Sequence, residues 1–309
     1  MNHPQPIFKA LRESPGIRLT VLFGSFFVLL LFCSIFAAFL GKIDSDPRTI
    51  TLIATTVQCV FAFCLPTYIL AKYSSHQPGK WLFLTTKPSL KALIGVVIIY
   101  IVSIPAMEWL IAWNADMHFP EALQGLETQF RQWEEAGEAS TTLLLETSGW
   151  FSALIGVLVI GVLTGFSEEM FFRGGLQGIL TRTSVGTGVA VWLSAFVFST
   201  MHFQFFGFLP RLLMGAFFGY LLVWSRSLWV PVFAHALNNS MVVIVSAITG
   251  ETTSSMIEST NSSEFLAHPI PVIVSGAFTI LFLVFFKESF FKKSSAKWQK
   301  NQLPPVIGR

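Results

Sequence analysis

Two neighbouring glutamates interrupt one of the longest apolar stretches of this sequence. Glu168 and Glu169 follow the run GVLVIGVLTGFS, and Arg173 stands four residues after Glu169. Ionisable groups at membrane depth are costly and are found mainly where they pair or take part in chemistry. Glu169 and Arg173 share one helix face and can form an ion pair, whereas Glu168 points about 100° away. The cluster therefore predicts one structural carboxylate and one that is free to react.

Two of the six histidines, His202 and His235, lie within or at the edge of apolar stretches. Phe198 stands four residues before His202 and Asn239 four residues after His235, so each pair shares a helix face. A buried carboxylate has a raised proton affinity and can take a proton from water. A neighbouring imidazole can orient that water, and an imidazole with an amide can stabilise an oxyanion. Because no serine or cysteine has an evident base, these residues favour hydrolysis by water.

Other interpretations of the same residues stay open at this point. A single Glu–Arg pair in a membrane is more often structural, and a single membrane histidine is often a packing contact. A carboxylate with two imidazoles also suits zinc, with Glu168, His202 and His235 as ligands, although no H-E-x-x-H motif is present. A transporter with a glutamate proton relay is a third class, but no inverted repeat favours it.

The chain that must position these residues has the composition of an integral membrane protein. Of its 309 residues, 53% are hydrophobic and 12% are charged, against about 25% charged in soluble domains. The net charge of +3 is small, and the basic residues lie mostly between apolar runs, so nucleic acid is not an expected partner. Cys33, Cys59 and Cys64 lie inside apolar runs and are expected to be small buried hydrophobes.

Eight apolar segments have lengths near the roughly 17–25 residues that a spanning helix needs. They are continuous and do not alternate, which predicts helices and not barrel strands. The segments are about 17–40, 51–72, 90–113, 150–182, 186–203, 207–225, 228–248 and 269–286. Since the first is long enough to span, no cleavable signal peptide is expected. Residues 2–16 are expected to form a short interfacial helix, and residues 115–147 an acid-rich loop.

Helix lengths bring two of the candidate residues to one depth. With a turn near Ser184, Glu168 lies sixteen residues before it and His202 eighteen after, each roughly 24–27 Å from the turn. His235 lies only about 10 Å into its own segment. A common site therefore requires the fourth and fifth helices to protrude beyond the cytoplasmic surface, or the seventh helix to start deeper.

Lysine and arginine are distributed unevenly among the loops. They gather in the N-terminal segment, in the loop after the second apolar segment and in the tail 287–309. The positive-inside rule then places both termini in the cytoplasm, which agrees with an even number of spans.

Three pairs of glycines have G-x-x-x-G spacing, which lets helices approach closely in membranes. We interpret these pairs as contacts within the molecule and not as dimerisation faces. They are Gly161/Gly165, Gly174/Gly178 and Gly215/Gly219.

The polar residues also form three motifs that resemble those of a known family, the CAAX prenyl protease and bacteriocin-processing (CPBP, or Abi) intramembrane proteases. E-E-x-x-x-R begins at Glu168, F-x-x-x-H joins Phe198 to His202, and H-x-x-x-N joins His235 to Asn239. All three occur in the family's order on separate predicted helices. Each motif alone is weak, but together they are specific, and they cover about residues 150–245.

The resemblance implies a polytopic all-α membrane protein of about eight spanning helices. Its single transmembrane domain would span 17–286, with a protease core at about 150–248 and a conical intramembrane cavity lined by the fourth to seventh helices. The segment 1–16 and the basic tail 287–309 would flank it in the cytoplasm. A bacterial cytoplasmic membrane is the expected location.

The resemblance also implies a role for each matched residue. Glu168 would activate water, His202 would hold or polarise that water, and His235 with Asn239 would stabilise the oxyanion. The supporting residues would be Glu169, Arg173 and Phe198. The family view favours a mechanism without a metal or other cofactor, with zinc as the alternative. The expected partners are the lipid bilayer and a peptide or lipidated-peptide substrate, and a non-catalytic immunity or scaffold protein is the competing function.

Overall fold

The computed structural model of this chain describes residues 11, 14–43, 46–146, 149–250 and 269–291, and all regular structure within them is helical. The predicted all-α class is therefore confirmed. Seven helices among these residues are long and apolar enough to cross a membrane, as in an integral membrane protein. The predicted segment 186–203 forms only the 14-residue helix α11 (Thr187–Thr200). The eighth predicted segment is thus present as a shorter apolar helix beside the seven long ones.

The long helices follow the predicted segments closely. The N-terminal ones are α2 (Pro15–Leu40), α3 (Pro47–Gln58) continuing through η1 (Cys59–Cys64) into α4 (Leu65–Ser74), the short α5 (Pro78–Trp81), and α6 (Leu90–Ala115). The fourth segment is a continuous helix of α8 (Trp150–Gly156), η3 (Val157–Leu163), α9 (Thr164–Glu169), η4 (Met170–Gln177) and α10 (Gly178–Leu180). The last three are α12 (Phe208–Ser225), α13 (Trp229–Thr249) and α16 (Pro269–Phe291).

Capping side chains explain where the first helices begin. The Ser14 side chain accepts a hydrogen bond from the amide of Ile17, so α2 starts at Pro15, two residues before the predicted boundary. Asp46 caps α3 in the same way, again with proline in the first helical position. Proline fits there because its missing N–H would have no partner in the helix. The rest of the predicted interfacial helix 2–16 lies largely outside the described residues.

The C-terminal boundary is also shifted. Helix α16 reaches Phe291, so Lys287 continues the last helix and does not begin the tail. Residues 292–309 of the predicted basic tail lie outside the described part of the chain.

The predicted acid-rich loop 115–147 is wrong, because most of it forms the helix α7 (Gln124–Leu145) after a short turn η2 (Glu121–Leu123). Glu127 anchors the start of this helix. Its carboxylate accepts hydrogen bonds from the amide of Phe119 at 2.7 Å and from Arg131 at 2.9–3.0 Å. The many charges of α7 obscure its amphipathic pattern in the sequence. Such a helix is stabilised mainly when its apolar face packs on neighbouring elements.

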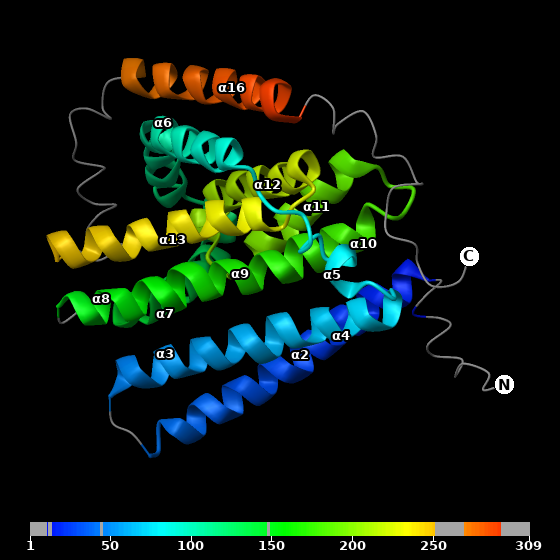
Figure 1. Cartoon of the computed structure of the whole chain (residues 1–309). Coiled ribbons are helices and arrows are strands. Elements are labelled where there is room, and N and C mark those ends of the chain that lie inside the picture. Colours follow the sequence, from blue (N-terminus) through cyan, green and yellow to red (C-terminus); the bar gives the residue numbers. More distant parts are fainter. Residues whose placement is uncertain (1–10, 12–13, 44–45, 147–148, 251–268, 292–309) are drawn as a thin grey trace.

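Figure 1 shows how the helices are arranged. The pair α2 and α3–α4 lies at one edge of the molecule, and α6 with α16 lies at the other. The continuous helix α8–α10 lies between them with α11, α12 and α13, and α13 runs alongside η3 and α9. The three elements that carry the predicted motifs therefore occupy the middle of the fold.

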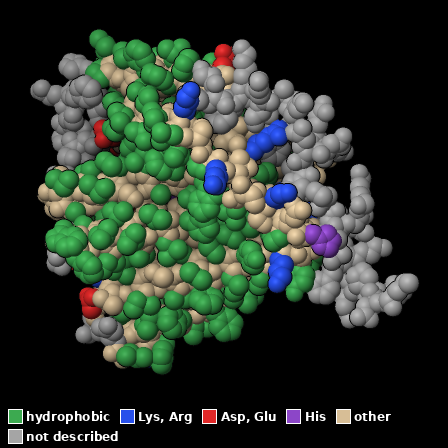
Figure 2. Space-filling view, in the orientation of Figure 1, with side chains coloured by type: hydrophobic (Ala, Val, Ile, Leu, Met, Phe, Trp, Pro, Cys, Tyr) green, Lys and Arg blue, Asp and Glu red, His purple; other side chains and the backbone are tan. Residues whose placement is uncertain are grey.

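The surface agrees with insertion into a bilayer. Figure 2 shows hydrophobic side chains over most of one face, with lysine and arginine gathered toward the end where α5 lies. The orientation of this end in a membrane stays a prediction of the positive-inside rule.

The start of α13 is covered by another part of the chain. Leu228 is fully buried, and its amide donates to the carbonyl of Phe83 at 2.9 Å, while the indole of Trp229 donates to Leu84. The loop after α5 therefore covers this helix end. His235 lies six residues, about 9 Å, into α13, yet it contacts Glu169, which lies about 16 Å before the end of α10. The two residues therefore meet, and which of the two predicted arrangements relative to the membrane surface applies stays a prediction.

Glycines set the closest helix contacts, as the spacing predicted. A Cβ on Gly165 would lie 3.0 Å from the backbone nitrogen of Ala236, and a Cβ on Gly161 would lie 2.1 Å from the hydroxyl of Ser240. These contacts join α9 and η3 to α13. A Cβ on Gly215 would likewise meet Ala195 of α11 at 3.2 Å. The G-x-x-x-G pairs at 161/165 and 215/219 thus serve packing within the molecule.

Candidate active site

Glu169 is the centre of a fully buried charged cluster. Its Oε1 lies 2.8 Å from a terminal nitrogen of Arg173, so the predicted ion pair is present, and both side chains are completely excluded from solvent. The same oxygen lies 2.9 Å from Nδ1 of His235. Because an ionised carboxylate only accepts hydrogen bonds, His235 donates its Nδ1 proton to Glu169. The link from Glu169 to His235 has no signal in the sequence, since the two residues are 66 positions apart.

Both terminal nitrogens of Arg173 have hydrogen-bond partners, whereas its buried Nε has none among the described residues. A second terminal nitrogen donates to the carbonyl of Gly215 at 2.8 Å, and the guanidinium carbon lies 4.7 Å from the ring centre of Phe198 and 5.4 Å from that of Phe218. Cations are attracted to aromatic faces, and a buried ion pair is stable only where its remaining hydrogen-bonding groups find partners. These contacts hold the guanidinium beside Glu169, and the supporting role of Arg173 stays a prediction.

Phe198 and Phe218 also fix the histidines. The Phe198 ring meets the His202 ring edge-on at 4.8 Å, as its spacing predicted, and the His235 ring edge-on at 5.8 Å. Phe218 stacks on His235 with ring centres 4.9 Å apart. Sequence reasoning missed Phe218, because one phenylalanine among 32 carries no distinguishing signal.

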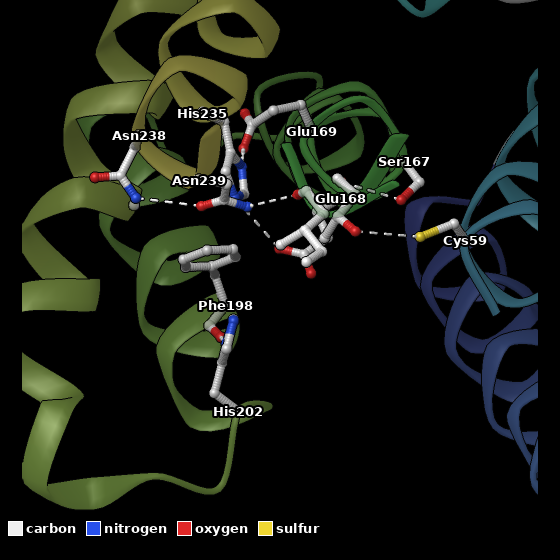
Figure 3. A network of polar contacts seen from close by, with 12 residues as sticks. Cys59, Ser167, Glu168, Glu169, Phe198, His202, His235, Asn238 and Asn239 are labelled. Carbon is white, nitrogen blue, oxygen red and sulfur yellow. Dashed lines mark hydrogen bonds and ion pairs between the residues drawn. The ribbon is translucent and has the colours of Figure 1, made fainter. Parts of the chain in front are cut away.

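Glu168 lies at the edge of the buried cluster and is partly exposed, with 14% of its side chain accessible. Its Oε2 lies 3.7 Å from Nε2 of His235, which is an ion-pair distance and too long for a direct hydrogen bond. The two adjacent glutamates therefore contact the two nitrogens of one imidazole from opposite sides, as Figure 3 shows.

His202 follows the end of α11, in a tight turn. Its Nδ1 lies 2.7 Å from the carbonyl oxygen of Phe198, to which it donates a proton. Its Nε2 is consequently the nitrogen that can accept a proton. Glu168, His235 and Arg211 all act electrostatically on this imidazole. The structure thus brings His202 into the same charged neighbourhood as Glu168 and His235, from a third element of the fold.

Asn239 lies one turn beyond His235 on α13. Its Nδ2 donates to the carbonyl of Ile160 at 3.2 Å, and its Oδ1 accepts a hydrogen bond from Asn238 at 3.2 Å. These two contacts orient the amide, and Nδ2 keeps a second proton. The acceptor carbonyl belongs to the π-helical stretch η3. Such stretches interrupt the regular helix pattern and are common at functional sites.

The side chains do not make an evident metal centre. Among the described residues, no group of three or more His, Cys, Asp or Glu side chains is placed to hold a metal ion. The bond from Nδ1 of His235 to Glu169 leaves Nε2 as the nitrogen that could bind a metal, so the zinc set of Glu168, His202 and His235 stays an alternative. The metal-free mechanism and the conical cavity expected from the resemblance stay predictions.

Comparison with known proteins agrees with this geometry. Residues 150–241 match the family described as type II CAAX prenyl endopeptidase Rce1-like. A protein of Bacillus subtilis (strain 168), titled "Uncharacterized protein YpbD", is 28% identical over 83 residues. That match covers 26% of this chain and 39% of the relative. No solved structure matches. The matched segment holds all three motifs and the whole buried cluster, so the similarity to the Rce1-like (CPBP) family covers the part of the chain that carries the candidate site.

Proposed function

We propose that this protein is an intramembrane endopeptidase that hydrolyses a peptide bond with water activated by Glu168. The observation that carries the proposal is the unequal environment of the two adjacent glutamates. Glu169 is fully buried and inaccessible to solvent, and its Oε1 is bonded to both Arg173 and His235. Glu168 is partly accessible and has no direct hydrogen bond to His235. Of the two, Glu168 is therefore the one available as a base.

The proposed reaction uses the distances around Glu168. The 3.7 Å between Glu168 and Nε2 of His235 leaves their polar atoms to be connected by water or by the substrate. Glu168 takes one proton from the attacking water, and the new hydroxyl group bonds to the carbonyl carbon of the scissile peptide. The carbonyl oxygen then carries the negative charge of a tetrahedral intermediate.

Groups on α13 would stabilise that charge. Asn239 offers its second Nδ2 proton, and His235 in its doubly protonated form offers Nε2–H while Glu169 holds Nδ1–H. When the intermediate collapses, the C–N bond breaks and the leaving amine takes the proton that Glu168 removed from water. His202 accepts a proton at Nε2 or orients the water, since its Nδ1 proton is held by Phe198.

The substrate class follows from family membership alone. We infer a membrane-embedded peptide or lipidated peptide, in the cytoplasmic membrane of a bacterium. A protein that keeps this cluster only as a polar packing core is the competing function, and it requires no chemistry from Glu168.

Comparative analysis of membrane peptides tests the proposal. Cells that carry the wild type and cells that carry Glu168→Gln are compared, with Glu108→Gln as the matched control. Glu108 also lies in an apolar helix, α6, but its side chain is exposed and belongs to no motif. Accumulation of one uncleaved peptide in Glu168→Gln alone is the expected result. Identical peptide patterns in all three strains would favour the non-catalytic function.

A further inference from the structure

Helix α7 packs against the segment that carries His202, although the two are separated by about 60 positions. The turn between α11 and α12 contains His202, Phe203, Gln204 and the short helix η5 (Phe205–Gly207), and η5 contacts α7 directly. A Cβ on Gly137 of α7 would lie 2.7 Å from the side-chain amide of Gln204, which shows how closely the helix approaches. The proposed mechanism has given α7 no role.

This turn is short and requires an unusual backbone conformation. Phe203 adopts a left-handed backbone with φ of 54°, which is unusual for a residue other than glycine. Such a conformation persists only where the surroundings impose it. Ser199 helps by donating to the carbonyl of Phe208 at 2.7 Å, which ties the end of α11 to the start of α12.

Two side chains from other elements satisfy the amides of this turn. Asn114 at the end of α6 is buried, and its Oδ1 accepts a hydrogen bond from the amide of Leu209 at 2.8 Å. Glu134 in the middle of α7 accepts one from the amide of Phe206 at 3.1 Å. The helix η5 and the first turn of α12 are thus held by acceptors that neither α11 nor α12 supplies.

Glu134 has a second contact that involves charge. Its Oε1 lies 3.9 Å from Arg211 of α12, and Arg211 in turn donates to the side chain of Gln204 at 3.1 Å and to the Gln204 backbone carbonyl. Arg211 also acts electrostatically on His202. Glu134 therefore fixes the residues next to His202 and partly neutralises a cation near it.

We propose that Glu134 of α7 is a positioning residue for His202, acting through the Phe206 amide and through Arg211. The inference rests on the proposed function of His202 in peptide hydrolysis. It also gives a reason for a partly buried acid on a helix that the sequence presented as a charged loop.

The effect of Glu134 on the stability of the fold distinguishes a positioning role from a merely structural one. Burial raises the pKa of Glu134, and this effect outweighs the lowering by the Phe206 amide and by Arg211; Glu138 adds to the rise. An acid whose pKa is higher in the folded state destabilises the fold once pH exceeds its ordinary value. Removing the charge of Glu134 is therefore not expected to lower the free energy of unfolding above that pH, although the turn becomes less well ordered.

The experiment compares Glu134→Gln and Glu134→Ala with the control Glu135→Gln, which removes the same charge from an exposed neighbour on α7. Peptide cleavage by purified protein and the imidazole carbon–proton NMR signals of histidine-labelled protein are both measured. The signal of His202 is identified by its loss in His202→Gln. Thermal unfolding confirms that each variant folds.

Loss of a charge-assisted hydrogen bond predicts a fall in kcat of about 10–100-fold for Glu134→Ala. A smaller fall is expected for Glu134→Gln, whose amide oxygen still accepts from Phe206. KM is expected to change less than about twofold, because Glu134 acts through the turn and not on the substrate. The His202 signal is expected to move in both variants and to stay in place in Glu135→Gln.

An unmoved His202 signal in Glu134→Ala would overturn the inference, as would wild-type kcat in that variant. An equal effect of Glu135→Gln would overturn it as well. If the wild-type protein itself cleaves no peptide, the proposed function fails, and the NMR comparison still decides whether Glu134 positions His202.

Discussion

The buried pair of Glu169 and Arg173 allows a quantitative test of how the site is held together. Changing Glu169 to glutamine preserves the shape of the side chain but removes its charge. Arg173 then has only neutral partners, which are the new amide oxygen, the carbonyl of Gly215 and the faces of aromatic rings, while remaining fully buried. Breaking a buried ion pair by removing one partner costs about 3–5 kcal/mol, mostly because the other charge stays behind.

The reverse change, Arg173→Gln, leaves Glu169 with one donor, Nδ1 of His235. We expect a similar loss of about 3–5 kcal/mol. The double variant leaves no isolated charge, because both side chains are then neutral amides. It is therefore expected to cost less than the sum of the single changes by about 1–3 kcal/mol.

Thermal unfolding in detergent can be followed with a thiol-reactive dye on the native chain. Cys33 and Cys59 are buried and free, so they react only when the protein opens. If the stability loss of the double variant equals the sum of the two single losses within about 0.5 kcal/mol, the coupling is refuted, because independent sites add to that accuracy. A second expectation concerns activity, because in Glu169→Gln the acceptor that orients His235 becomes a neutral amide, whereas Arg173→Gln retains the carboxylate.

Two further predictions concern packing and pH. Gly165→Ala is expected to cost about 1–3 kcal/mol and to disturb the contact between Glu168 and His235, because the new Cβ would meet the backbone of Ala236 at 3.0 Å; Gly188→Ala has no atom within 4 Å and serves as the neutral control in the same unfolding assay. The Phe119 amide, followed by Arg131 and His118, lowers the pKa of Glu127 to about 2 from an ordinary 4.5. A carboxyl group whose pKa is lowered on folding stabilises the fold above its ordinary pKa. The unfolding midpoint of Glu127→Gln is therefore expected to lie furthest below that of the wild type at pH 6, and this difference is expected to shrink between pH 4.5 and 2. A difference that is independent of pH over that range would contradict this.

The sequence predicted the apolar helices well because their signal is local. Continuous apolar runs have one stable solution in a bilayer, and the caps at Ser14 and Asp46 moved the boundaries only slightly. Helix α7 escaped prediction because its order depends on contacts with distant residues, such as the bond of Glu134 to the Phe206 amide. The shortness of α11 escaped because the apolar run continues past the turn at His202, and composition does not mark a turn that other elements impose.

The same distinction applies to the site. The ion pair of Glu169 with Arg173 and the contact of Phe198 with His202 follow from i, i+4 spacing on one helix, and both are confirmed. The sharing of Glu169 between Arg173 and His235 depends on where α13 starts, and the loop after α5 determines that start. No local pattern encodes such a relation between helices.

The central claim is that Glu168 is the base, and single-turnover cleavage by purified protein tests it most directly. The substrate is a peptide identified from the Glu168→Gln membranes, and Glu108→Gln is the control. Loss of a general base predicts cleavage about 10²–10⁴-fold slower in Glu168→Gln, with an unchanged thermal midpoint and with Glu108→Gln at the wild-type rate. Cleavage by correctly folded Glu168→Gln at the wild-type rate would contradict the account.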